Sequence, residues 1–163
     1  MNILYLHGLD SRLNAEKRSI LEKYGTVYSP KIDYRKEKKN IEKLLKDFED
    51  RSISVVIGSS MGGFTGYYLA NELQVPALLF NPALAYRSVH QDIPNLVKTK
   101  SGFKYLVLGA KDEIVKPKDT LEFIGNSLGM DKYRIDIRQD LAHRIPVNIF
   151  EEKVKAFFER VNR

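Results

Sequence analysis

A serine stands at the centre of a glycine-flanked pentapeptide, Gly58-Ser59-Ser60-Met61-Gly62, between a run of β-branched residues and a helical pattern. This spacing is typical of a nucleophile elbow, in which the chain reverses sharply from a strand into a helix and exposes one hydroxyl. The flanking glycines let the two backbone segments cross without a Cβ between them. We therefore predict that Ser60 is a nucleophile.

A serine hydroxyl is a weak nucleophile, so it needs a general base and usually a carboxylate that orients the base. The chain has three histidines. His143 follows the last predicted strand, as the order serine, acid, histidine requires, and we predict that it is the base; the alternative is an exposed loop histidine. We expect His90 at the surface or at a pocket rim, and His7 as a group that orders its loop.

Two aspartates are candidates for the orienting acid. Asp112 closely follows a predicted strand and lies between Ser60 and His143 in the chain, so we predict that it is the acid. The alternative for Asp112 is a charge favoured near the N-terminus of the next helix. Asp140 is the runner-up, but three residues from His143 it would more easily stabilise a turn.

Acyl transfer also needs hydrogen-bond donors where negative charge develops on the carbonyl oxygen. The residue after the nucleophile, Met61, supplies one backbone N–H group. We predict that Leu9 supplies the second, because Gly8 before it allows the backbone to come close to a ligand. Asp10 and Ser11 are expected to cap the helix that follows rather than to belong to the site.

Apolar runs that suit buried strands alternate with helical patterns along the chain, which predicts a parallel sheet with helices on both faces. The predicted strands are Ile3–Leu6, Thr26–Ser29, Ile53–Ile57, Ala77–Phe80, Tyr105–Leu108 and Tyr133–Ile137. The predicted helices are Asn14–Lys23, Glu37–Phe48, Gly62–Leu73, Pro117–Ser127 and Pro146–Val161. The interval 81–102 is expected to form a loop or a short helix that borders the active site.

The formal net charge of +6 could suggest nucleic-acid binding, but much of it falls on residues 35–50, where acidic and basic residues alternate around an apolar stripe. This pattern favours the solvated face of an amphipathic helix, and no nucleic-acid-binding motif accompanies it. The chain has no cysteine, which excludes thiolate zinc sites and disulfides. We expect no metal, no cofactor, no membrane span and a cytoplasmic location.

The motifs YLHGLDS, GSSMGG, FNPAL and GAKDEIV, with the loop of His143, resemble those of the α/β-hydrolase superfamily, and most closely its small bacterial YqiA-like esterases. The resemblance implies a reduced three-layer fold of about six mostly parallel strands without a large lid. It assigns the triad to Ser60, Asp112 and His143. It also implies that Gly8, Asn81 and Pro82 line the substrate pocket.

The sequence therefore predicts one domain over residues 1–163 and a serine hydrolase that cleaves short-chain or small carboxylic esters through an acyl-enzyme. Asp140-Leu141-Ala142 replaces the glycine that many relatives carry near the catalytic histidine. Two alternatives stay open. One is a thioesterase or amidase with the same triad, and the other is a non-catalytic binding protein with the same fold.

Overall fold

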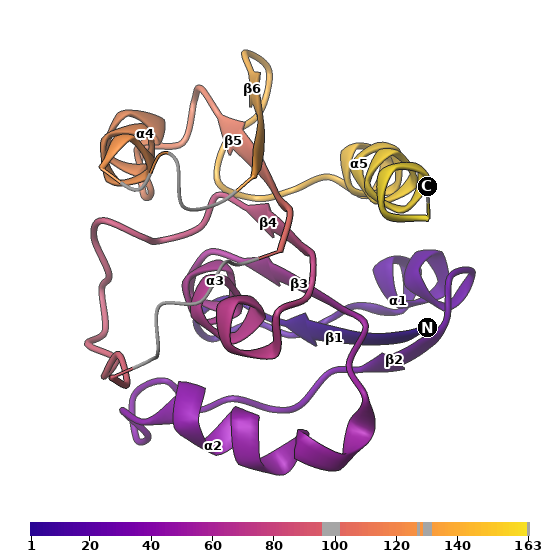
Figure 1. The fold of residues 1–163 in the computed structure, drawn as a ribbon. Coiled ribbons are helices and arrows are strands. Elements are labelled where there is room, and N and C mark those ends of the chain that lie inside the picture. The colour runs from indigo at the N-terminus through magenta and orange to yellow at the C-terminus, as the bar shows by residue number, and fades with distance from the viewer. Residues whose placement is uncertain (96–101, 127, 129–131, 163) are drawn as a thin grey trace.

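A computed structural model describes residues 1–95, 102–126, 128 and 132–162, and it contains a six-stranded sheet in which every neighbouring pair is parallel. The strand order is β2-β1-β3-β4-β5-β6 (Figure 1). The strands are β1 (Asn2–Leu6), β2 (Thr26–Tyr28), β3 (Val55–Ser59), β4 (Ala77–Phe80), β5 (Lys104–Gly109) and β6 (Tyr133–Arg138). The predicted parallel sheet is thus confirmed.

Helices cover both faces of this sheet. They are α1 (Ala15–Glu22), α2 (Asn40–Asp47), α3 (Met61–Leu73), α4 (Pro117–Gly125) and α5 (Val147–Val161), with a short 3₁₀ helix η1 (Glu49–Arg51) after α2. Helices α1 and α5 lie together on one face, and α2, α3 and α4 lie on the other (Figure 1). The arrangement is the three-layer α/β architecture that the sequence predicts.

Alternate strand residues supply the two apolar cores. In β1, Leu4 and Leu6 join the core under α2, α3 and α4, whereas Ile3 and Tyr5 join the core under α1 and α5. All four side chains are buried. Because successive strand residues point to opposite faces, a strand covered on both sides must be apolar on both, as Ile3–Leu6 of β1 are.

Most element boundaries lie within one residue of the expectation, and those of β3 and α2 differ by up to three residues. Strand β3 runs from Val55 to Ser59 instead of from Ile53 to Ile57, because Gly58 and Ser59 still pair with β4. Helix α2 begins at Asn40, three residues later than expected. The predicted end of α4 at Ser127 lies outside the described residues.

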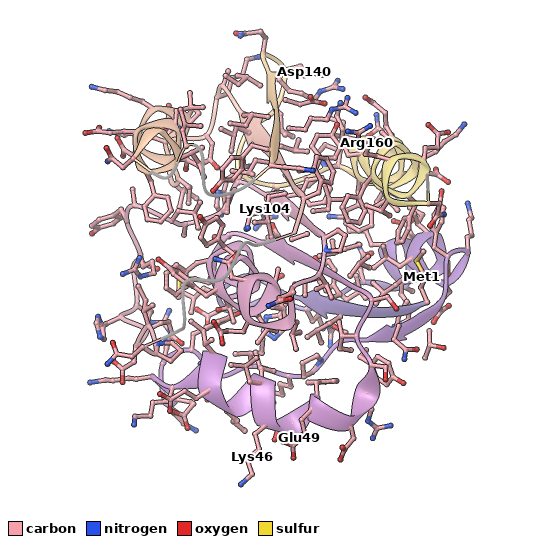
Figure 2. All side chains as sticks on the ribbon, in the orientation of Figure 1. Met1, Lys46, Glu49, Lys104, Asp140 and Arg160 are labelled. Carbon is pink, nitrogen blue, oxygen red and sulfur yellow. The ribbon has the colours of Figure 1, made fainter. Side chains whose placement is uncertain are left out.

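The charged segment near α2 is a solvated face. Ile41 and Leu44 of α2 are buried, whereas Lys46 and the nearby Glu49 project away from the sheet (Figure 2). The interval 81–102 was expected to form a loop or a short helix. Its residues 83–95, which the structure describes, contain neither a helix nor a strand. None of the helices in the described ranges combines the length and the apolar character that a membrane span requires.

The chain crosses itself closely where β3 turns into α3. A Cβ on Gly58 would lie 2.3 Å from the carbonyl oxygen of Gly62, and a Cβ on Gly62 would lie 2.0 Å from the carbonyl oxygen of Leu6. Real Cβ atoms cannot approach backbone oxygens so closely. The glycine spacing therefore lets α3 pack against the ends of β1 and β3.

Replacing Gly62 tests this crossing. We expect Gly62→Ala to lower the free energy of unfolding by about 3 kcal/mol or more, because the added methyl overpacks a backbone contact. Urea denaturation measures the change. The matched control is Gly125→Ala at the end of α4, where an added Cβ meets no atom within 4 Å, so stability should hold or rise slightly. Equal midpoints for the two variants would contradict the prediction.

Candidate active site

Ser60 occupies a strained turn between β3 and α3, with φ 55° and ψ −117°. Three backbone hydrogen bonds hold it: its N–H donates to the carbonyl of Phe80, and its own carbonyl accepts from Phe64 and Ala83. A non-glycine residue persists in such a conformation only when its surroundings impose it. The turn therefore has the geometry of a nucleophile elbow.

Asp112 and His143 come from loops that follow β5 and β6, and they form a hydrogen bond. The Nδ1 atom of His143 lies 2.8 Å from Oδ2 of Asp112. The other carboxylate oxygen accepts the N–H groups of Ile114 and Val115, each at 2.9 Å. Asp112 is only 3% exposed, so its carboxylate is held in place before any ligand arrives. The pairing fixes the imidazole with a proton on Nδ1 and Nε2 free to accept one.

Ser60 and His143 line the same cavity, which has a volume of about 590 Å³. Gly8 and Leu9 also line it, so four of the expected site residues meet there. Among the described residues, the Ser60 hydroxyl makes no hydrogen bond. The hydrogen bond that a general base would make with it, from the imidazole of His143, is therefore not formed in this structure. Such bonds often tighten only when substrate binds.

The loop after β1 lies directly beside Ser60. A Cβ on Gly8 would lie 3.4 Å from the Cβ of Ser60. Next to it, Asp10 has a positive φ of 51°, which turns the chain after Leu9. Within the described ranges, the N–H groups of Leu9 and Met61 have no backbone acceptor, so both donors are available.

His7 has a structural role in this loop. Its Nε2 accepts the N–H of Ile32 at 3.0 Å, so Nδ1 carries the proton and donates to the carbonyl of Gly8 at 2.7 Å. The hydroxyl of Tyr34 donates to the carbonyl of His7. These contacts tie the end of β1 to residues 32–34 and agree with the expectation that His7 orders its loop.

Asn81 connects the loops that carry Asp112 and His143, and it is not among the residues that line the cavity of Ser60. Its Oδ1 accepts the N–H of Gly109 at 2.7 Å, and its Nδ2 donates to the carbonyls of Ala142 and His143 at 3.0 and 3.1 Å. It is 1% exposed. Pro82 is buried against Gly63 and is likewise absent from the lining. Asn81 therefore links the end of β4 to β5 and to the His143 loop. We call these three hydrogen bonds of its side chain the Asn81 bracket.

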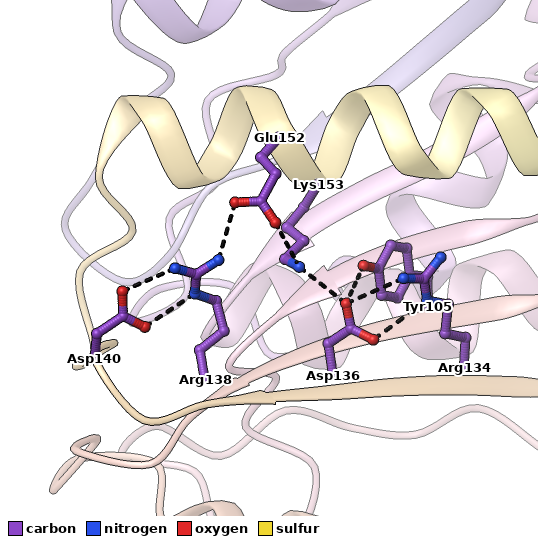
Figure 3. A network of polar contacts seen from close by, with 7 residues as sticks. All are labelled: Tyr105, Arg134, Asp136, Arg138, Asp140, Glu152 and Lys153. Atoms are coloured by element: carbon purple, nitrogen blue, oxygen red, sulfur yellow. Dashed lines mark hydrogen bonds and ion pairs between the residues drawn. The ribbon is translucent and has the colours of Figure 1, made fainter.

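A polar network fastens β6 to α5 on either side of the His143 loop (Figure 3). Arg138 donates to Asp140 and Glu152, and Lys153 bridges Glu152 and Asp136. Asp136 also binds the side chains of Tyr105 and Arg134. The hydrogen bond from Arg138 lowers the pKa of Asp140 to about 2. Asp140 thus pairs with Arg138, while His143 pairs with Asp112.

Other residues lie where the sequence did not indicate. The cap of α1 is Asn14, whose Oδ1 accepts the N–H of Lys17, and not Asp10 or Ser11. His90, by contrast, is exposed as expected, and it pairs with Asp92. Asp10 and Ser11 line the cavity, although they were expected to cap α1 rather than to belong to the site. The lining also contains residues that the sequence did not single out: Tyr5, Arg12, Asn14, Lys17, Ser59, Ser88, Ile114, Arg144 and Ile145. Most of them lie close to the motifs in the chain, and this proximity is the one signal that could have found them.

Comparisons with known proteins identify the family of the chain and a shared fold. Residues 2–121 match UPF0227, described as an uncharacterised protein family. No curated protein matches the chain.

Several solved structures share the fold over nearly the whole chain. SOBER1 of Arabidopsis thaliana is 12% identical, with a TM-score of 0.73 over 100% of this chain and 99% of that one. A monoacylglycerol lipase of Paleococcus ferrophilus is 13% identical, with a TM-score of 0.70 over 99% and 94%. A Bacillus cereus carboxylesterase is 15% identical, with a TM-score of 0.65 over 96% and 87%. These likenesses show a common α/β-hydrolase fold.

The bracket formed by Asn81 can be tested with an isosteric substitution. Asn81→Asp keeps an acceptor for Gly109 but replaces the donor to two carbonyls by a second acceptor, so we expect a loss of roughly 3 kcal/mol in unfolding free energy. Asn148→Asp, exposed in the first turn of α5, is the control and should change stability by less than about 0.5 kcal/mol. Urea denaturation of both variants decides; an unchanged Asn81→Asp protein would refute the bracket.

Proposed function

The chain belongs to the YqiA-like UPF0227 family and has an α/β-hydrolase fold, and we propose that it is a serine hydrolase of small carboxylic esters. One arrangement carries the proposal. A strained Ser60 shares a cavity with His143, whose Nδ1 atom is bonded to the buried carboxylate of Asp112. This set has the parts that acyl transfer to a serine requires.

In the proposed reaction, Nε2 of His143 takes the proton of the Ser60 hydroxyl as Oγ attacks the ester carbonyl carbon. The oxygen of the tetrahedral intermediate accepts hydrogen bonds from the N–H groups of Leu9 and Met61. Collapse breaks the ester bond, and His143 returns its proton to the leaving alcohol. Asp112 keeps the proton on Nδ1 throughout and stabilises the imidazolium.

Water then releases the acyl group. His143 takes a proton from water, the hydroxide attacks the acyl carbonyl, and the carboxylic acid leaves as Ser60 recovers its proton. The same residues would hydrolyse a thioester or an amide, because the leaving group is selected by the shape of the cavity.

Substitution of the triad tests the mechanism. We expect Ser60→Ala and His143→Ala each to lower kcat/KM for p-nitrophenyl acetate by roughly 10⁴-fold or more, because triad members act as a unit. Both variants should stay folded, which circular dichroism checks.

The control is His90→Ala, which removes an exposed histidine outside the cavity and should change kcat/KM by less than about twofold. Labelling with a fluorophosphonate should modify the wild type at Ser60 and fail in Ser60→Ala. A folded Ser60→Ala protein with near wild-type turnover would remove Ser60 from the mechanism. A wild type that neither turns over esters nor labels would favour a non-catalytic protein.

The cavity also predicts a substrate size. Residues 83–95 form no helix or strand that could act as a lid, and the cavity lining is rich in polar side chains. Each methylene adds about 0.8 kcal/mol only while it is buried, so kcat/KM should peak at short acyl chains. Measurement over p-nitrophenyl esters from acetate to palmitate, below their micelle-forming concentrations, checks this. A steady rise to palmitate would indicate a deep acyl tunnel instead.

A further inference from the structure

Positive charge gathers around the cavity that contains Ser60. Arg12 lines it from the loop after β1, Lys17 from α1, and Arg144 from the loop that holds His143. Asp10 is the single acidic residue in this lining, and its carboxylate pairs with Arg35 at 2.7 Å. Arg35 does not line the cavity, so Asp10 is paired with a cation outside the lining and leaves Arg12, Lys17 and Arg144 unpaired with it.

Arg12 and Arg144 differ from the other arginines in having no partner within the described part of the chain. The other arginines that the structure describes each contact a carboxylate, a carbonyl oxygen or an aromatic ring: Arg18, Arg35, Arg51, Arg87, Arg134, Arg138 and Arg160. A guanidinium group presents five N–H donors in a planar fork that matches carboxylate and phosphate oxygens. Two such forks are therefore available beside Ser60.

Lys17 adds a cation that is fixed in position. Its ammonium donates to the carbonyl of Ile145 at 2.7 Å and lies 5.2 Å from the ring centre of Phe150. Burial lowers its pKa, and within the described ranges no carboxylate pairs with it. A partly buried cation without an anion is costly, and a negatively charged ligand would offset that cost.

We infer that the ester cleaved at Ser60 carries an anionic group, a carboxylate or a phosphate, that binds among Arg12, Lys17 and Arg144. The inference rests on the proposed hydrolase function and adds the class of substrate. Arg12 lies on the loop after β1, Lys17 on α1 and Arg144 on the loop of His143, and all three line the cavity that contains Ser60. A small ester can therefore place its carbonyl at Ser60 and its anionic group on an arginine. Charge-assisted hydrogen bonds of this kind give specificity as well as affinity.

Matched esters test the inference. On the leaving-group side, 4-acetoxybenzoate and 4-acetoxyphenyl phosphate are compared with the neutral methyl 4-acetoxybenzoate. On the acyl side, mono(4-nitrophenyl) adipate is compared with 4-nitrophenyl hexanoate. Each kcat/KM is divided by the rate constant for alkaline hydrolysis of the same ester, which removes differences in intrinsic reactivity.

We expect the wild type to prefer the anionic ester by about tenfold in at least one comparison, since partly exposed ion pairs contribute modestly. The benzoate and the phosphate then distinguish the two anionic groups. Arg12→Gln with Arg144→Gln should reduce the preference to less than about twofold, and added salt should reduce it in the wild type. Arg51→Gln, beside Asn2 at the opposite end of β1, is the matched control and should keep the preference.

The outcomes separate this inference from the proposed function. Turnover of neutral and anionic esters at equal corrected rates would overturn the inference and leave the hydrolase standing. A preference that survives in the Arg12→Gln, Arg144→Gln protein would overturn the assignment of these arginines. If no ester is cleaved and no fluorophosphonate labels Ser60, both the proposed hydrolysis and the preference for anionic esters are refuted. Calorimetry with adipate on the wild type and the double variant then shows whether an anion site exists.

Discussion

The backbone contact between Gly62 and Leu6 is the constraint on which the rest of the candidate site depends. It brings the start of α3 against the end of β1, while Gly58 and Gly62 let the chain reverse within a few residues. The reversal forces Ser60 into its strained conformation, and hydrogen bonds to Phe80 and Ala83 keep it there. The same contact sets Gly8 next to Ser60. The proposed nucleophile and the loop of one expected oxyanion donor are thus positioned by the same packing contact.

The features that depend on residues close together in the chain could be predicted from the sequence. Continuous apolar runs predicted the buried parallel strands, and helix α3 begins one residue before its predicted start at Gly62. The spacing of Gly58 and Gly62 around Ser60 indicated the sharp turn before any coordinates, because only glycine fits such a crossing. The chain order of Asp112 and His143 suggested two residues that the structure brings within hydrogen-bonding distance.

Features that depend on distant contacts were not readable. Asn81-Pro82 after β4 resembled a pocket wall, but the amide of Asn81 meets groups that lie 28 to 62 residues further along the chain. Nothing local distinguishes Asn14 from Asp10 or Ser11 as the cap of α1, since all three side chains can accept a backbone N–H. Likewise, an arginine without a partner can be recognised only when the positions of the other charged groups in the structure are known.

The bracket at Asn81 has a consequence for the way this fold can vary. The Asn81 side chain hydrogen-bonds both the end of β5 and the His143 loop, so the distance between them cannot exceed the span of one amide group and its two hydrogen bonds. Lengthening either loop at that point would break the bracket, so insertions there would be poorly tolerated. Residues 85–90 carry mostly exposed side chains and no regular structure, so added chain is accommodated more easily there. New recognition elements could therefore be grafted onto this segment while the bracket remains unchanged.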